Sequence, residues 1–193
     1  MEIMQTRLAE AEYRNRLNNR VAVAVALISA FMAVTKIKDD NIVQAMLQAK
    51  SDAVDTWNEY QAKKLKLHVA ELGLNQARAL RLAVPPRGMS VLAAQEKAYD
   101  DTVARYQAES EAIMKKAKGF EKQYDDLNFR DDQFDLSDAA LSSSLATLAV
   151  TALTTNLWLF RLSLFFAGCG GLMGAAGLFG LSLHPSWLTN LLS

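Results

Sequence analysis

The sequence predicts an all-α membrane protein, in which a long antiparallel helical hairpin lies between the first and second of three transmembrane helices. Two adjoining apolar stretches, residues 139–160 and 162–183, contain no charged residue and are separated only by Arg161. Each has about the ~20 residues that an α-helix needs to cross ~30 Å of hydrocarbon. A shorter apolar run covers residues 21–35, and most of the acidic and basic residues lie between these membrane segments.

The N-terminal part is predicted to be helical throughout. Residues 1–20 form a short charged helix rich in arginine and glutamate, and residues 21–35 form transmembrane helix 1. No small-x-small cleavage pattern follows this run at the right place, so we interpret it as a retained anchor rather than a cleaved signal peptide. Since no proline occurs between residues 21 and 83, the helix is expected to continue out of the membrane.

Residues 36–135 are predicted to form a soluble helical hairpin with its turn at 84–89. Pro85, Pro86 and Gly88 interrupt the helix there, because proline removes a backbone donor and clashes with the preceding turn. The two arms have similar lengths of about 47 residues, or ~70 Å at 1.5 Å per residue. Arms of equal length return the chain to the membrane that it left.

The second arm carries the clearest periodicity in the chain. Its apolar and aromatic residues alternate four and three positions apart, which is the pattern of a coiled-coil seam that needs a partner helix. These residues are Tyr99, Val103, Tyr106, Ser110, Ile113, Ala117, Phe120, Tyr124 and Leu127. The first arm offers a less regular row, which consists of Ile42, Met46, Ala49, Ala53, Trp57, Tyr60, Leu65, Val69 and Leu72. The seam faces either the other arm or a neighbouring chain.

The last part is predicted to contain transmembrane helix 2 at 136–160, transmembrane helix 3 at 162–183 and a tail at 184–193. Arg161 is expected in an interfacial turn between the two helices. The third helix is rich in glycine, and small residues let membrane helices approach closely. The residues expected to pack there are Gly170, Gly171, Gly174 and Gly177. Packing within the chain and self-association are both open interpretations of this pattern.

Hydroxyl side chains recur every four residues along the second transmembrane helix, at Ser143, Thr147, Thr151 and Thr155. This spacing places them on one slowly turning face. Hydrogen bonding between helices is the favoured interpretation, because no ionisable residue joins the row. The alternative is that these residues line the pore of an oligomer.

Acidic residues gather where the hairpin meets the membrane. Asp39 and Asp40 follow the first transmembrane helix, and Asp131, Asp132 and Asp135 precede the second. In the hairpin these two groups become neighbours. A solvated interface is the simpler interpretation, and a cation-attracting acidic collar or a weak Ca²⁺ or Mg²⁺ site is the alternative. No dedicated metal or cofactor site is predicted.

Several functional classes find no support in the sequence. The formal net charge is zero, which argues against a nucleic-acid partner. There is no phosphate loop, dinucleotide fingerprint or nucleophile elbow, and His68 and His184 are isolated, so no enzymatic activity is expected. Arginines precede the first membrane helix, and Arg161 lies between the second and third. The positive-inside rule therefore favours a cytoplasmic N-terminus and a periplasmic hairpin.

The layout resembles an uncharacterised bacterial family, domain of unknown function 4337. The residues that carry the resemblance are Ala53, Trp57, Tyr60, Gln61, Ala62 and Lys63, then Phe134, Asp135, Leu136, Ala139, Ala140 and Leu141, and finally Trp158 and Leu159. The polar row in the second transmembrane helix departs from the family's pattern. The resemblance implies a small bacterial inner-membrane protein and no established activity.

The sequence therefore favours a non-enzymatic, homo-oligomeric scaffold that is anchored in the lipid bilayer and presents a helical hairpin. A cation channel lined by the second transmembrane helix is one alternative. An accessory subunit of a larger membrane complex, bound to a heterologous protein, is another.

Overall fold

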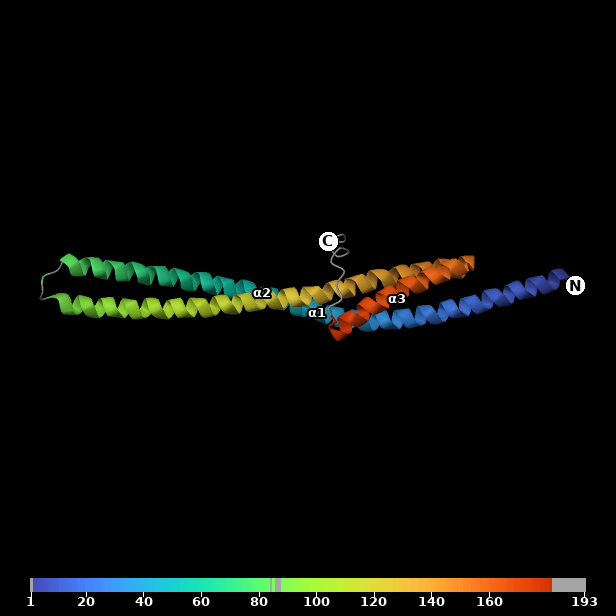
Figure 1. Ribbon diagram of the computed structural model, residues 1–193, viewed down its shortest axis with the longest axis horizontal. Helices are drawn as coiled ribbons and strands as arrows, with labels where there is room; N and C mark the ends of the chain where they lie inside the picture. The colour runs from blue at the N-terminus through green and yellow to red at the C-terminus, as the bar shows by residue number, and fades with distance from the viewer. Residues whose placement is uncertain (1, 84, 86–87, 182–193) are drawn as a thin grey trace. The chain divides into compact units, whose positions relative to one another are not determined.

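The computed structural model describes residues 2–83, 85 and 88–181, which form three α-helices and no strand (Figure 1). Helix α1 spans Glu2–Ala83, α2 spans Met89–Thr154 and α3 spans Leu157–Phe179. The prediction of an all-α protein is confirmed over these residues. Each of the three helices also contains a stretch that is long and apolar enough to cross a membrane.

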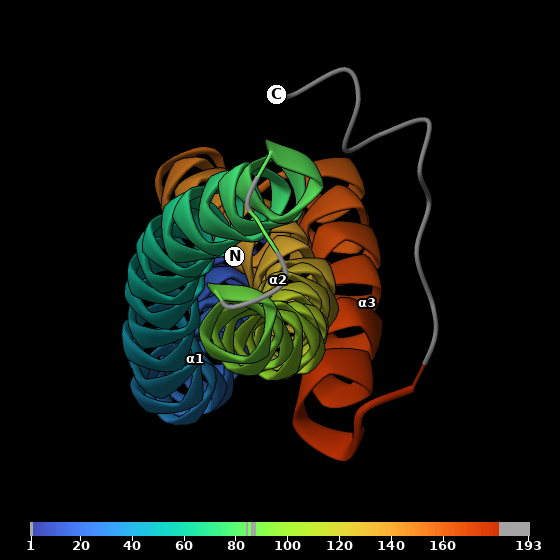
Figure 2. The ribbon, with the colours of Figure 1, turned by 90° about the vertical axis from the view of Figure 1, so that its left-hand side faces the viewer.

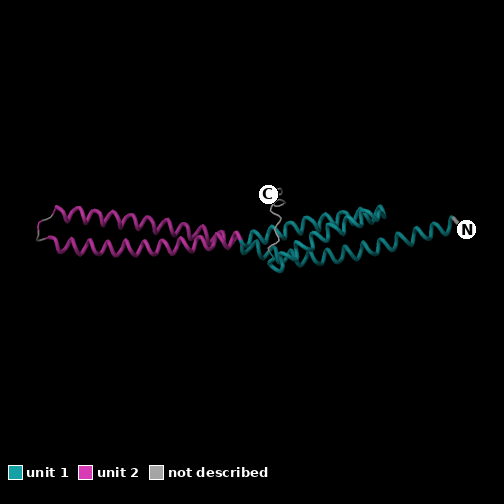
Figure 3. The backbone as a smooth tube through the Cα atoms, viewed as in Figure 1, with its two compact units in different colours: residues 1–45, 126–193 teal, residues 46–125 magenta. Residues whose placement is uncertain are grey.

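The chain divides into two compact units (Figure 3). Unit 1 comprises Met1–Ala45 and Asp126–Ser193, and unit 2 comprises Met46–Asp125. Helices α1 and α2 contribute to both units, whereas α3 belongs to unit 1 alone. The charged N-terminal helix, the first apolar run and the first arm are thus parts of one helix, because neither proline nor glycine interrupts them before Gly73.

The end of α1 and the beginning of α2 lie close to the expected turn. Helix α1 ends at Ala83, two residues before Pro85, and α2 begins at Met89. The backbone N–H of Gly88 donates to the carbonyl oxygen of Pro85 over 3.1 Å. Residues 84, 86 and 87 lie outside the described residues.

In unit 2, the segments 46–83 and 89–125 lie side by side and run in opposite directions (Figures 1 and 2). Contacting pairs show this order, because residue numbers fall along α2 as they rise along α1. Trp57 contacts Glu121, Lys63 contacts Glu109, and Arg81 contacts Glu96. Small or aliphatic residues of α1 form the buried surface between the segments, namely Ala49, Ala53, Leu67, Ala70, Leu74 and Ala77.

Unit 1 has a core made by all three helices. Val21 and Ile28 of α1 pack with Leu141 and Leu148 of α2, and side chains of α3 border this cluster. Leu148 is fully buried. This core lies within the apolar runs of the sequence, so the segments expected in the membrane are also the segments that pack together.

The link between α2 and α3 is not at Arg161, and the predicted boundaries 136–160 and 162–183 are wrong at this point. Helix α2 ends at Thr154, Thr155 has a positive φ of 52°, and α3 begins at Leu157. The Asn156 side chain accepts a hydrogen bond from the Trp158 N–H at 2.9 Å, which satisfies one of the free donors at the start of the helix. Arg161 is the fifth residue of α3, since arginine favours helix.

Helix α3 ends at Phe179, four residues before the predicted end. Gly180 has a φ of 67°, a left-handed conformation that glycine adopts without strain, and the Leu181 N–H donates to the Ala176 carbonyl at 2.9 Å. The predicted tail at 184–193 lies outside the described residues.

Candidate functional site

The acidic collar predicted from the sequence is partly assembled in unit 1. Asp39 of α1 is buried, and its Oδ2 lies 2.8 Å from Lys36 Nζ. Asp131 of α2 lies close enough to Asp39 for that residue to raise the pKa of the Asp131 carboxyl. Asp40 is exposed and lies 3.8 Å from the same lysine. The lysine therefore neutralises part of the charge that the aspartates bring together.

These contacts perturb the protonation of the aspartates on α2. Burial raises the pKa of Asp131 to about 6, and the neighbouring charges of Asp135 and Asp39 add to the effect. Partial burial, followed by the charge of Asp39, also raises the pKa of Asp135. The hydrogen bond from Lys36 to Asp39 raises the pKa of that lysine. The cluster thus holds a proton on Asp131 at pH values below about 6, where a free aspartate would still be ionised.

The cluster does not have the geometry of a metal centre. Over the part of the chain that the structure describes, no group of three or more histidine, cysteine, aspartate or glutamate side chains is arranged to hold a metal ion. Asp132 has a partner of its own.

The row of hydroxyls on α2 is satisfied mainly by its own helix. Ser143, Thr147 and Thr151 each donate to the carbonyl oxygen four residues earlier, over 2.8 Å. Ser143 is exposed and Thr151 is fully buried, so the row passes from the surface into the core. Thr155 lies beyond the end of the helix and donates to the carbonyl of Thr154. The O–H donors of these groups are therefore satisfied without a second helix.

Two other hydroxyls of α2 make the bonds between helices. Ser137 donates to the Gly170 carbonyl at 2.8 Å, and Ser144 donates to the Ser163 carbonyl at 2.7 Å. Both donors are buried. Near the end of α3, Arg130 and Gln133 donate to the carbonyls of Gly177 and Leu181. The periodicity of the sequence does not single out Ser137 and Ser144, because it does not show which face of α2 meets α3.

The glycines of α3 fall into two groups. A Cβ atom on Gly170, Gly174 or Gly177 would lie less than 3 Å from atoms of α1 or α2, among them Phe31 and Phe134. Gly168 and Gly171 have open space at the same position. Three of the four glycines predicted to pack therefore touch helices of the same chain, and Gly171 does not.

The residues of the predicted seam lie on the side of α2 that α1 covers. Tyr99, Tyr106, Ile113 and Phe120 are each half-buried, and Ala117 is fully buried. Cations of both arms lie over their rings: Lys63 Nζ is 5.3 Å from the centre of the Tyr106 ring and Lys116 Nζ is 5.7 Å from that of Phe120. Such contacts attract a cation to the electron-rich face of the ring.

Ion pairs border this covered strip in unit 2. Lys63 Nζ lies 2.6 Å from Glu109 Oε2, an interaction that raises the pKa of the lysine and lowers that of the glutamate. The Glu96 carboxylate forms ion pairs with both Arg78, at 3.3 Å, and Arg81, at 2.7 Å. These pairs fix which residues of the two segments stand opposite each other.

The seam expected on α1 is wrong after Tyr60. Leu65, Val69 and Leu72 are exposed by 66%, 62% and 68%, whereas Leu67 and Leu74 are buried. Helix α1 carries two apolar rows, and the row that meets α2 continues through Leu67, Ala70, Leu74 and Ala77. We call the other row, which consists of Leu47, Val54, Leu65, Val69 and Leu72, the outer row.

The described residues thus define an all-helical protein. Each of its three helices contains a potential membrane-spanning stretch, and parts of α1 and α2 also form the more polar unit 2. The chain belongs to the family described as domain of unknown function (DUF4337), which matches residues 17–180. The predicted family membership is confirmed. No curated protein and no solved structure matches the chain.

Proposed function

We propose that this protein is a membrane-anchored helical scaffold that self-associates through unit 2. In this proposal the apolar parts of α1, α2 and α3 span the inner membrane of a bacterium, and unit 2 forms the antiparallel hairpin outside it. The chain carries no catalytic activity, and its partners are the bilayer and further copies of itself.

The observation that carries the proposal is the outer row of α1. Its five residues follow one another at intervals of seven, eleven, four and three positions, which are close to whole helical turns. They therefore share one face of the helix, and each is more than half exposed. Large aliphatic side chains aligned in this way favour burial against another helix.

The outer row is directed away from the surface that α2 already covers. Ala49, Thr56, Leu67 and Leu74 are buried on the opposite face of α1, half a turn from the outer row. Helix α1 of unit 2 is consequently apolar on two sides, and its own chain supplies a partner for only one. A second copy of unit 2 is the simplest partner with a matching apolar surface.

The distribution of arginines supports the orientation. Arg14, Arg16 and Arg20 precede the apolar run of α1, and Arg161 lies near the start of α3. With three membrane crossings these residues lie on the same side, which the positive-inside rule assigns to the cytoplasm. Unit 2 then lies in the periplasm. The hydroxyl row of α2 adds no support for a pore, because its hydroxyls are bonded within the helix.

The test is the mass of the intact particle in nanodiscs, measured by native mass spectrometry. The natural chain is compared with the double variant Leu65→Glu and Leu72→Glu, which places two charges in the outer row. Ala112→Glu and Ala108→Glu together provide the control, because both alanines are exposed on α2 and lie opposite its covered face. Circular dichroism shows whether each variant retains its helices.

We expect a defined multimer for the natural chain and the control, and a single-chain mass for the outer-row variant with its helical content unchanged. A single-chain mass for the natural protein, both in nanodiscs and in mild detergent, would overturn the proposal. So would a multimer that survives both charges in the outer row.

A further inference from the structure

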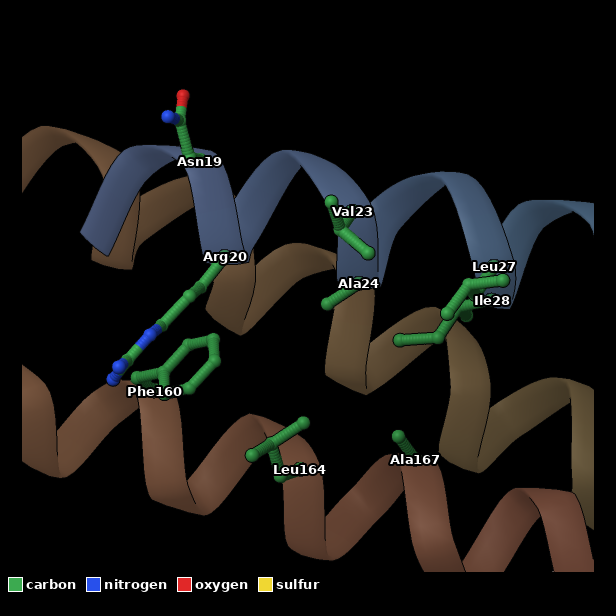
Figure 4. Close-up of a pocket in the computed structure, with 9 residues that line it drawn as sticks. All are labelled: Asn19, Arg20, Val23, Ala24, Leu27, Ile28, Phe160, Leu164 and Ala167. Atoms are coloured by element: carbon green, nitrogen blue, oxygen red, sulfur yellow. The ribbon is translucent and has the colours of Figure 1, made fainter. Parts of the chain in front are cut away.

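A groove of about 500 Å³ runs between α1 and α3 in unit 1 (Figure 4). Its walls are the side chains of Val23, Ala24, Leu27, Ile28, Phe160, Leu164 and Ala167, with Asn19 and Arg20 at one end. The volume lies in the range of ~300–1,000 Å³ that is typical of small-molecule sites. Apart from that end, all the lining residues are apolar.

The chain leaves the groove unfilled. Val23, Leu27 and Leu164 line it and are exposed by 60%, 67% and 46%. In water such a surface would be costly, whereas in a bilayer the acyl chains of lipids cover it at no such cost. The walls therefore fit a long flexible hydrocarbon chain.

The end of the groove is cationic. In Figure 4 the Arg20 side chain extends from α1 toward Phe160 of α3, whereas Asn19 points away from α3. No carboxylate among the described residues forms an ion pair with Arg20, whereas Arg16 is paired with Glu12. Arg161 follows Phe160 directly in the sequence and adds a second positive charge near this end. A planar guanidinium matches the geometry of a phosphate group.

We propose that the groove binds an anionic phospholipid, with an acyl chain between α1 and α3 and the phosphate on Arg20. The proposal rests on the membrane location given above, because only a bilayer presents such a ligand. Basic pockets between membrane helices are suited to anionic headgroups. The groove and Arg20 together supply both parts of the site, an apolar channel and an unpaired cation at its mouth.

A helix from a second copy is a poorer occupant of this groove. Close helix packing in membranes uses small residues, and the groove is walled largely by Val23, Leu27, Phe160 and Leu164. The outward-facing small residues of α3, Gly168 and Gly171, do not line it. The site is therefore shaped for a thin, flexible chain rather than for another backbone.

The test uses the full chain, stripped of lipid in detergent and then supplied with phosphatidylglycerol or phosphatidylcholine of the same acyl chains. Native mass spectrometry measures how much of each lipid remains bound. Arg20→Gln removes the charge at the groove, and Arg16→Gln is the matched control because it removes a positive charge one turn earlier on the same helix. Leu164→Trp fills the groove.

We expect the natural chain and Arg16→Gln to retain phosphatidylglycerol about fivefold better than phosphatidylcholine, because both lipids carry a phosphate but only phosphatidylglycerol has the net negative charge that an arginine favours by about this factor. Arg20→Gln should lose this preference, and Leu164→Trp should weaken the binding of both lipids. Equal losses in both arginine variants, or no preference in the natural chain, would overturn the proposal. A change of subunit number in Leu164→Trp, with lipid binding intact, would assign the groove to a second copy and overturn it too.

The result of the lipid-binding test can be distinguished from the result of the self-association test. Charges in the outer row change the particle mass and leave lipid selectivity intact, whereas Arg20→Gln changes selectivity and leaves the mass intact. A chain that is recovered from cells without any membrane association would overturn both proposals.

Discussion

The two units hold their helices together by different chemistry. In unit 2 the segments of α1 and α2 are joined by ion pairs, such as Lys63 with Glu109 and Arg81 with Glu96. In unit 1 the ion pairs found among the described residues stay within α1, as Lys36 with Asp39 does. Besides the apolar core, contacts between helices there include hydrogen bonds from side chains of α2 to backbone carbonyls of α3 and close approaches at glycines.

This difference follows from the solvent that each unit is suited to. Between membrane helices there is no hydrophobic gain from packing, so close approach at small residues and buried hydrogen bonds hold helices together. In water the burial of apolar area drives association, and charged residues at the border tolerate solvent. Each unit thus carries the contacts that are effective in one of the two environments, which supports a membrane location for unit 1 and an aqueous one for unit 2.

The largest effect is expected where the backbones of unit 1 come closest. A Cβ at Gly170 would lie 2.7 Å from Leu141 Cγ and 2.9 Å from the backbone oxygen of Ser137, which has little room to move. Gly170→Leu should therefore lower the Tm of unit 1 by about 5–10 °C, as overpacking does. Gly168→Leu is the control, because that position is open. Thermal unfolding in mild detergent measures both, and equal Tm values would contradict the close approach.

The carboxyl cluster makes the stability of unit 1 depend on pH. Asp131 has its pKa raised to about 6 in the folded protein, from an ordinary value of 3.8. Between these values the folded state binds more protons than the unfolded state, so stability falls as the pH rises from about 4 to about 6. The groups that face Asp131 are Asp39, Asp132 and Asp135, with Lys36 close to Asp39.

Asp131→Asn should remove much of this pH dependence. At pH 7 we expect its Tm to exceed that of the natural chain by about 2–4 °C, the shift for ~1 kcal/mol after allowance for solvent screening. At pH 4 the two Tm values should converge, because the natural side chain is then largely protonated. The exposed Asp101→Asn in unit 2 serves as the control, and an advantage of Asp131→Asn that is the same at both pH values would contradict the raised pKa of Asp131.

The ion pairs near the end of α1 should make unit 2 respond to salt. Glu96 pairs with both Arg78 and Arg81, so Glu96→Gln removes two interactions near the end of α1. Exposed pairs of this kind contribute ~1 kcal/mol or less, and 1 M salt screens them. Hydrogen exchange of residues 75–83 should accelerate by up to about fivefold at low salt and not at 1 M salt. Glu111→Gln is the control, and a difference that persists at 1 M salt would count against an electrostatic cause.

The smallest effect is expected for the one glycine of α1. A Cβ at Gly73 would lie 2.6 Å from Cε1 of the Tyr99 ring, which is the far end of a side chain that can rotate. Gly73→Ala also gains about 0.5–1 kcal/mol of helix preference, which offsets the cost of moving the ring. We therefore expect a Tm within about 2 °C of the natural value. A fall in Tm as large as that of Gly170→Leu would show that the Tyr99 ring cannot move. The packing around Gly73 in unit 2 would then be as rigid as that around Gly170 in unit 1.

The sequence predicted the elements better than the faces of the helices. The heptad spacing from Tyr99 to Leu127 leaves one apolar face on α2, and that face is the covered one. Helix α1 has two apolar rows in unit 2, and periodicity cannot say which row meets the partner. The row through Leu65 has large side chains only, whereas the alanines at 70 and 77 in the other row allow the closer approach of α2.

The acidic cluster and the link between α2 and α3 were also only partly predictable from the sequence. The two groups of aspartates were expected to meet, but burial of Asp39 and its contact with Asp131 depend on how α1 and α2 pack. Arg161 predicts a link at its own position because it interrupts an apolar run, whereas the link is formed by Thr155 and Asn156. The better signal was Asn156, a residue type that commonly begins a helix.

The shortness of the link between α2 and α3 also bears on the biosynthesis of the chain. In the membrane location proposed above, a link of only Thr155 and Asn156 favours entry of α2 and α3 from the translocon into the lipid together, as a helical hairpin. The buried hydroxyls of Ser137 and Ser144 already have their carbonyl partners within that hairpin, so it can leave the aqueous channel without exposing unsatisfied polar groups to hydrocarbon.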